Sequence, residues 1–311
     1  PPTRSVRRRR RGGRRSRPGA ALGAVGAGAV AAMLQHHDRK RVEELDGVVN
    51  VLRNLSWLDS LHDLIIEASF LPNLVSLLVS SRTQTQEAAA IVLADLSTRQ
   101  HLLPHLVAGG ALPNVVQLLS RGNASLVERA MKTLSNMVCI PDAARELQAS
   151  GRIDVIVPHL SMGSQNTQMS AVLVIGAIVS AVGERQRYLQ TGAVERIAAL
   201  IVAGQMRHDG LLYALGELCE DASVCEVLGG MEPPWAPCRS WLIKSVQAAF
   251  SDLDLRQRCA FVLRRIAKVP NEGVKAALVN GGAMSAAMDL LQQQEDATLC
   301  ADLSGMMYDL A

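Results

Sequence analysis

A nine-residue phrase that recurs 41 residues later constrains the fold of this chain more than any other feature. Residues 70–78 read Phe-Leu-Pro-Asn-Leu-Val-Ser-Leu-Leu, and residues 111–119 read Ala-Leu-Pro-Asn-Val-Val-Gln-Leu-Leu. A fixed offset of this size indicates one supersecondary unit that is stacked on copies of itself. Because such a unit cannot bury its apolar face alone, neighbouring units bury it and build an elongated solenoid.

The period extends well beyond these two copies. Gly110, Gly151 and Gly192 are 41 residues apart, Ser69 precedes them, and Gly230 and Gly282 follow at wider steps. A second set shares an apolar position at steps of 40 to 48 residues: Leu52, Leu93, Leu134, Ile175, Leu215, Leu263 and Met307. The widened steps and three prolines predict an inserted surface loop over residues 231–238, because proline does not fit a helix interior.

Within each unit the apolar residues follow helical spacing. Leu74, Leu77 and Leu78 show this pattern, and no stretch alternates with the period of a strand. Each unit is predicted to hold a short helix, a glycine bend, a second helix and a longer third helix. Glycine permits the positive φ of a sharp bend, and Pro72 and Pro113 suit a first helical turn. The predicted fold class is all-α.

These motifs resemble those of the armadillo-repeat family. The phrase Gly-Ala-Leu-Pro-x-Val-Val-x-Leu-Leu at 110–119 is similar to its bend and second helix, and Leu-x-Asn-Met or Leu-Arg-Asn-Leu at 134–137 and 52–55 to its third. The resemblance covers residues 42–311, about six to seven units, of which the first contributes only a helix at 43–57. It implies a right-handed superhelix whose third helices line a concave groove.

The resemblance also places candidate binding residues at one phase of the third helices. Polar amides there can pair with the backbone of an extended partner, acidic residues favour a basic partner, and the basic residues near 129–136 favour an acidic one. The predicted groove residues are Asn54, Asp95, Arg129, Lys132, Asn136, Tyr213, Glu217, Phe261 and Arg265.

The groove departs from the importin-α branch of the family. That branch uses a tryptophan four residues before each groove asparagine to grip a basic peptide. Here the asparagine occurs only at Asn54 and Asn136, and the tryptophan position holds no tryptophan, only the aromatics Tyr213 and Phe261. The leading hypothesis is therefore a protein-binding scaffold or adaptor. Two alternatives stay open: a nuclear transport receptor with an autoinhibitory basic arm, and a chaperone regulator of the armadillo-fold nucleotide-exchange-factor type.

Charge divides the chain into two parts. Residues 1–41 hold 12 basic residues and one acid, whereas residues 42–311 hold 20 basic and 28 acidic residues. We therefore expect a disordered, low-complexity basic arm over 1–41 and an acidic solenoid over 42–311. The arginines of the basic arm are Arg7, Arg8, Arg9, Arg10, Arg11, Arg14, Arg15 and Arg17.

Several roles fit the basic arm. Arginine runs bind import receptors and nucleic acid, an Arg-rich segment free of acids is typical of organelle presequences, and a plain disordered tail is the simplest alternative. The apolar stretch that follows, residues 20–34, is shorter than the roughly 20 residues of a membrane span, so no membrane partner is expected. A cytoplasmic or nuclear location is expected, with organelle targeting left open.

No motif indicates catalysis, a cofactor or a metal. The sequence lacks a nucleophile elbow and a P-loop, and Gly23–Gly28 is glycine-rich without the strand that a dinucleotide site needs. His101 and His105 are four residues apart, but Pro104 is expected to begin a helix between them and no further ligands follow. The six cysteines form no Cys-x-x-Cys pair and are expected to be reduced, with those in apolar helices acting as small hydrophobes.

Overall fold

The computed structural model describes residues 71–204, 208–230, 235–248, 252–292 and 296–311. The basic arm, the predicted helix at 43–57 and Asn54 lie outside these residues. Helices connected by turns make up the described part, and it contains no strand. The helices are α4 (Leu71–Leu77), α5 (Thr83–Ser97), η2 (Gln100–Leu102), α6 (Leu103–Ala108), α7 (Ala111–Arg121), α8 (Ala124–Met137), α9 (Pro141–Ala149), α10 (Ile153–Ile156), η3 (Val157–Leu160), α11 (Gln165–Val182), α12 (Gln186–Gln190), α13 (Ala193–Ala203), α14 (His208–Leu218), α15 (Ala222–Leu228), α16 (Trp235–Gln247), α17 (Leu253–Ala267), α18 (Glu272–Asn280), α19 (Ala283–Leu291) and α20 (Ala297–Leu310).

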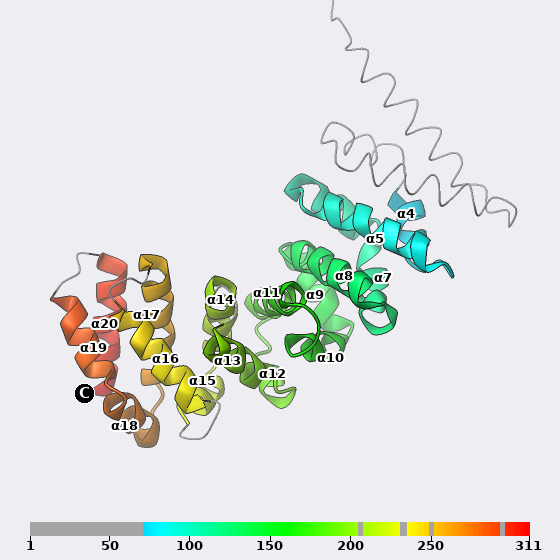
Figure 1. Ribbon diagram of the computed structural model, residues 1–311. Helices are drawn as coiled ribbons and strands as arrows, with labels where there is room; N and C mark the ends of the chain where they lie inside the picture. Colours follow the sequence, from blue (N-terminus) through cyan, green and yellow to red (C-terminus); the bar gives the residue numbers. More distant parts are fainter. Residues whose placement is uncertain (1–70, 205–207, 231–234, 249–251, 293–295) are drawn as a thin grey trace, which may run out of the picture.

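The helices repeat in groups of three along a curved array (Figure 1). The longer third helix of each group, α8, α11, α14, α17 or α20, packs against the third helix of the next group, as α5 packs against α8. The first helices α12, α15 and α18 follow one another along the lower edge of the array in Figure 1. The predicted unit of two shorter helices and a longer third helix is therefore confirmed.

Glycine forms the bend between first and second helices, as predicted, in four units. Gly110, Gly151, Gly192 and Gly282 all have φ between 69° and 86°, in the left-handed region that favours glycine. Gly230 was predicted to hold the same role, and this is wrong, because it does not adopt a positive φ. In that unit the buried guanidinium of Arg239 instead donates to the carbonyls of Gly229 (2.7 Å) and Gly230 (2.8 Å).

Two prolines change the second helices locally. The loop predicted over 231–238 is wrong from Trp235 onward, since α16 begins there and holds Pro237 in its first turn, where a missing N–H breaks no helical hydrogen bond. Residues 231–234 lie outside the described residues. In the unit before α11, the second helix divides into α10 and the 3-10 helix η3, which contains Pro158.

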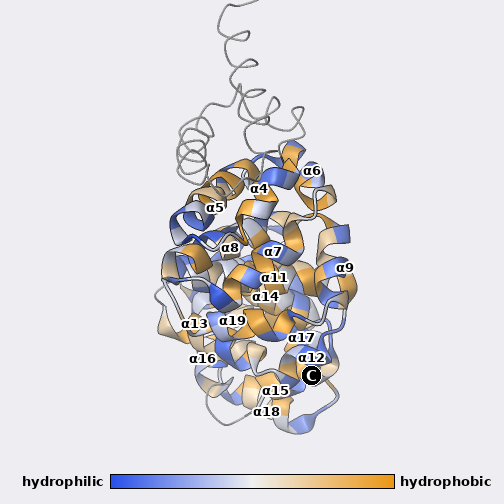
Figure 2. Ribbon diagram, turned by 90° about the vertical axis from the view of Figure 1, so that its right-hand side faces the viewer, coloured by the Kyte–Doolittle hydropathy of each residue, from blue (hydrophilic) through white to orange (hydrophobic). Residues whose placement is uncertain are grey.

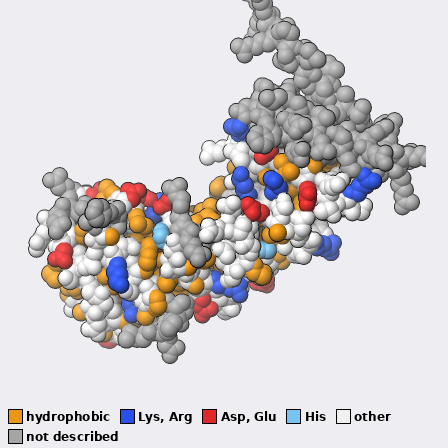
Figure 3. All heavy atoms as spheres, viewed as in Figure 1, with side chains coloured by type: hydrophobic (Ala, Val, Ile, Leu, Met, Phe, Trp, Pro, Cys, Tyr) orange, Lys and Arg blue, Asp and Glu red, His pale blue; other side chains and the backbone are white. Residues whose placement is uncertain are grey.

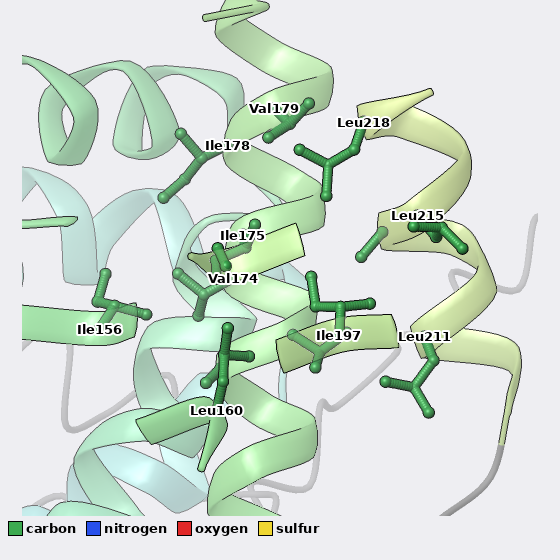
Figure 4. Close-up of a cluster of buried hydrophobic side chains, with 14 of the residues drawn as sticks. Ile156, Leu160, Val174, Ile175, Ile178, Val179, Ile197, Leu211, Leu215 and Leu218 are labelled. Atoms are coloured by element: carbon green, nitrogen blue, oxygen red, sulfur yellow. The ribbon is translucent and has the colours of Figure 1, made fainter. Parts of the chain in front are cut away.

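The core lies between the three layers of helices and is built from small and branched aliphatic side chains. The predicted repeat positions Leu93, Leu134, Ile175, Leu215 and Leu263 are all buried, and Met307 is half-buried. Figure 4 shows Ile156 and Leu160 meeting side chains of α11, α13 and α14 in one cluster. Seen along the array, hydrophobic residues concentrate toward the middle of the stack (Figure 2).

The cysteines and the long helix α11 need separate mention. Cys219, Cys225, Cys238 and Cys259 are buried free thiols, as expected of small hydrophobes, but Cys139 is exposed because it lies beyond the end of α8. Among the described helices, α11 by itself is long and apolar enough to span a bilayer. Because it packs against α8, α9 and α14, its composition is accounted for by a central place in the core.

Candidate binding groove

Three hollows join into one groove across the third helices. The first, about 970 Å³, lies between α8 and α11, and the second, about 560 Å³, shares Ser135, Asn136 and Leu173 with it. The third, about 270 Å³, lies between α14, α17 and α20 and shares Tyr213 with the second. In the space-filling view, charged side chains of both signs lie over the α5–α8 end of the array, and hydrophobic ones are prominent farther along it (Figure 3).

The structure brings most of the predicted groove residues to this surface. Two groups line it at opposite ends. The first hollow contains Asp95, Arg129, Lys132 and Asn136. The third contains Tyr213, Glu217 and Phe261. Arg265 lines none of the three hollows, because its guanidinium pairs with Glu220 and lies 5.0 Å from the centre of the Phe261 ring.

Asn136 is held in one orientation by the preceding unit. Its Nδ2 donates to the Ser97 Oγ at 2.9 Å, and that hydroxyl in turn donates to the carbonyl of Ala94 at 2.7 Å. The contact spans two units, from α8 to α5. Because the amide nitrogen is engaged, the amide oxygen of Asn136 is the atom left to accept a backbone N–H from a bound chain.

The basic residues of the first hollow keep their charges available. Arg129 and Lys132 form no ion pair with any residue in the described ranges. The neighbouring carboxylate of Glu128 is engaged by neutral groups, the Ser164 hydroxyl at 2.7 Å and the Asn166 amide at 3.1 Å. These hydrogen bonds, with smaller contributions from Arg129 and Lys132, hold the pKa of Glu128 below its usual value.

Two aromatic rings form the floor at the other end of the groove. A Cβ added at Gly176 of α11 would lie 2.9 Å from the Tyr213 ring, and one added at Gly216 of α14 would lie 3.4 Å from the Phe261 ring. Each ring therefore rests on a glycine of the preceding third helix. Tyr213 and Phe261 remain half-buried, with part of each ring open to the groove.

Glu217 stands between these rings with an unpaired charge. Its side chain makes no hydrogen bond or ion pair to the residues that the structure describes, although its backbone carbonyl accepts from Arg185 Nε at 2.7 Å. The other carboxylates of the third hollow are matched. Asp254 pairs with Arg258 at 2.8 Å, and Asp302 pairs with Arg264 at 2.9 Å.

Sequence reasoning missed the apolar part of the groove on α11. Leu173 and Met162 are exposed and line the first hollow together with Met169. Leu173 occupies the same repeat phase as Lys132 and Tyr213, 41 and 40 residues away, so this position was within reach of the repeat alignment.

A repeated polar link between units was also missed. Glu87 accepts from Asn123, the N-cap of α8, and Glu128 accepts from Ser164, the N-cap of α11. Gln257 repeats the link toward the α20 N-cap, Asp296, at 3.0 Å. The signal was present in the sequence, because Glu87 and Glu128 are 41 residues apart, as are Asn123 and Ser164.

Comparisons with known proteins define the class of fold. No protein-family model and no curated protein matches the sequence. Among solved structures, the chain resembles one reported for a phosphorylation switch in the interaction between cadherin and β-catenin, at 12% identity and TM-score 0.80, covering 94% of this chain and 57% of that one. It also resembles an engineered protein at 19% identity and TM-score 0.75, covering 94% of this chain and 73% of that one.

A third similar structure is a computationally designed armadillo repeat protein for modular peptide recognition. The identity is 16%, the TM-score 0.51, and the coverage 91% of this chain and 99% of that one. At these identities the likeness concerns the fold alone. The chain has the armadillo-repeat fold, and the predicted all-α right-handed superhelix is confirmed.

The described residues hold no group of three or more His, Cys, Asp or Glu side chains placed to bind a metal ion. Pro104 lies in the first turn of α6, as expected, between His101 and His105. The groove chemistry is therefore that of a recognition surface: a fixed amide, unpaired charges and an apolar floor.

Proposed function

We propose that this chain is a protein-binding scaffold that holds an extended segment of a partner protein in the groove of its third helices. The observation that carries the proposal is the continuity of the hollow, in which Asn136, Leu173 and Tyr213 connect one part to the next. An extended chain can lie along such a surface, and its side chains then alternate between the groove floor and solvent.

The groove offers the contacts that an extended segment needs. The amide oxygen of Asn136 faces a backbone that carries an N–H at each residue, and Ser97 fixes the amide beforehand. Prior fixing lowers the side-chain entropy lost on binding. Leu173 and the rings of Tyr213 and Phe261 supply apolar area, which contributes about 25 cal/mol for each Å² removed from water.

The similar structures agree with this use of the fold. One is a design for modular peptide recognition, and another concerns the interaction of β-catenin with cadherin. A nuclear transport receptor and a chaperone regulator are the alternatives. The first would prefer strongly basic peptides, and the second would bind a folded domain without competition from peptides.

The test is a selection of short random peptides displayed on phage, with the full chain as bait. Leu173→Glu places a charge in the middle of the groove, while Val279→Glu is the matched control on α18, where a similarly exposed apolar side chain (43% against 37%) lies outside the groove hollows. We expect peptides that bind the wild type and Val279→Glu but are lost with Leu173→Glu. Equal binding to all three proteins would contradict a groove site.

A further inference from the structure

The unpaired charges of the groove are separated by sign. Arg129 and Lys132 of α8 are cations without an ion pair among the described residues, whereas Glu217 of α14 is a carboxylate without one. Asp254 and Asp302, which share the hollow with Glu217, are neutralised by Arg258 and Arg264. The groove therefore presents uncompensated positive charge at one end and uncompensated negative charge at the other.

The helix between these ends carries no charge at all. The sequence of α11 contains no Asp, Glu, Lys, Arg or His, and it contributes Ser170, Leu173 and Ala177 to the groove. A bound segment that crosses α11 with a charged side chain facing the floor would lose hydration without gaining a partner. The order along the groove is thus basic, apolar and acidic.

We propose that the groove selects a partner segment with one acidic and one cationic side chain separated by about six residues, with an apolar side chain between them. The proposal rests on the proposed function. Third helices that pack directly lie about 8–10 Å apart, so α8 and α14 are separated by about 20 Å. An extended chain covers this distance in about six residues at about 3.3 Å each.

Each end has chemistry for its charge. An Asp or Glu of the segment meets Arg129 and Lys132, which lie beside the already engaged Glu128. A Lys or Arg of the segment meets Glu217 beside the ring of Tyr213, whose face adds cation–π attraction. A segment of the wrong charge meets repulsion at that end, so the pattern gives specificity as well as affinity.

The experiment sequences the peptides that the displayed library yields against the full-length wild type and two charge reversals. Wild type should enrich peptides with one acid and one cation at the stated spacing. Lys132→Glu makes both ends acidic and should enrich two cations, while Glu217→Lys makes both ends basic and should enrich two acids. We expect the disfavoured pattern to fall about fivefold or more at physiological salt and to recover at high salt.

Matched controls lie outside the groove hollows. Lys244→Glu on α16 and Glu226→Lys on α15 reverse exposed charges that line none of them, and both should enrich the wild-type pattern. The neutral variants Lys132→Gln and Glu217→Gln should lose the preference at one end each without reversing it. Melting curves like that of the wild type confirm that every variant is folded.

Three results would overturn the proposal, and they are distinguishable. If Leu173→Glu abolishes binding but the charge reversals leave the enriched pattern unchanged, the groove binds peptides and the charge pattern is not what it recognises. Enrichment of cations at both ends by the wild type also overturns it and fits a transport receptor. If no enrichment responds to any groove variant, the proposed function fails together with this inference.

Discussion

Tyr213 of α14 packs so closely on Gly176 of α11 that a Cβ on this glycine would lie 2.9 Å from the Tyr213 Cε1. The next unit repeats the arrangement more loosely, with Phe261 at 3.4 Å from a Cβ placed on Gly216. Direct contact of a ring with the backbone of the preceding helix fixes the height of the groove floor. The two glycines therefore connect unit stacking with the shape of the binding surface.

Gly176→Ala and Gly216→Ala should have opposite effects on stability. Overpacking at Gly176 forces the Tyr213 ring to shift and is expected to cost about 1–3 kcal/mol. At Gly216 the added methyl makes an ordinary contact, and the higher helix propensity of alanine should leave stability unchanged or raise it by up to about 1 kcal/mol. Urea unfolding of both variants measures the difference. Equal losses would show that ring packing on glycine does not limit these positions.

Arg239→Ala should be one of the more damaging single changes in the second helices. It removes two charge-assisted hydrogen bonds to the carbonyls of Gly229 and Gly230 in a buried site, which we expect to cost about 2–4 kcal/mol. Arg145→Ala is the control, because its ion pair with Asp142 is exposed and should contribute less than about 0.5 kcal/mol. A loss at Arg239 no larger than that at Arg145 would contradict this role for the guanidinium.

The repeat phase explains why so much of the fold was predictable. The burial of Leu93, Leu134 and Ile175 and the positive φ of Gly110 and Gly192 follow from local spacing that every unit repeats. Gly230 was misread because its carbonyls are satisfied by a side chain nine residues farther along, a tertiary contact that no spacing rule reveals. The start of α16 was missed because prolines that break a helix interior are tolerated in its first turn.

The groove was predictable in its position and less so in its chemistry. Phase alone placed Lys132, Asn136 and Glu217 on the groove surface. Phase could not show that Arg265 is engaged by Glu220, or that Asn136 is held by Ser97, because both depend on neighbouring units. The binding roles of these residues remain predictions, and so does that of Asn54, which lies outside the described residues.

Lowering the pH should destabilise the array through His208. Burial, opposed by Asp209 and by a hydrogen bond to the backbone of Ile201, lowers the pKa of His208 below its usual 6.5. Its Nε2 is buried without a hydrogen-bond partner in the described part of the chain, and its ring stacks on Trp241 at 4.4 Å. The unfolded chain therefore takes up a proton at higher pH than the folded one.

It follows that the stability associated with neutral His208 is fully present above the usual pKa and is lost as the pH falls below it toward the lowered value. Unfolding free energies measured from about pH 7 to about pH 5 should fall less steeply for His208→Gln than for the wild type. His159, whose pKa burial also lowers, accounts for part of the remaining slope. An unchanged slope in His208→Gln would rule out this contribution.

Deleting residues 1–41 tests whether the basic arm competes for the groove. This segment has a net charge of +11 and is attached to a body of net charge −8. Tethering gives an effective concentration in about the millimolar range, so even a weak site such as the one at Glu217 would be occupied. We expect deletion to raise peptide affinity at low salt and to have no effect at high salt. Unchanged affinity at low salt would exclude an inhibitory arm.

The central claim is that a partner segment lies along the third helices. The direct measurement is photo-crosslinking: a library-selected peptide carries benzoylphenylalanine in place of its central apolar residue, and mass spectrometry locates the adducts on the full chain. The account predicts adducts on α8, α11 and α14, centred on the surroundings of Leu173. Adducts confined to the first helices α9, α12, α15 and α18 would contradict it.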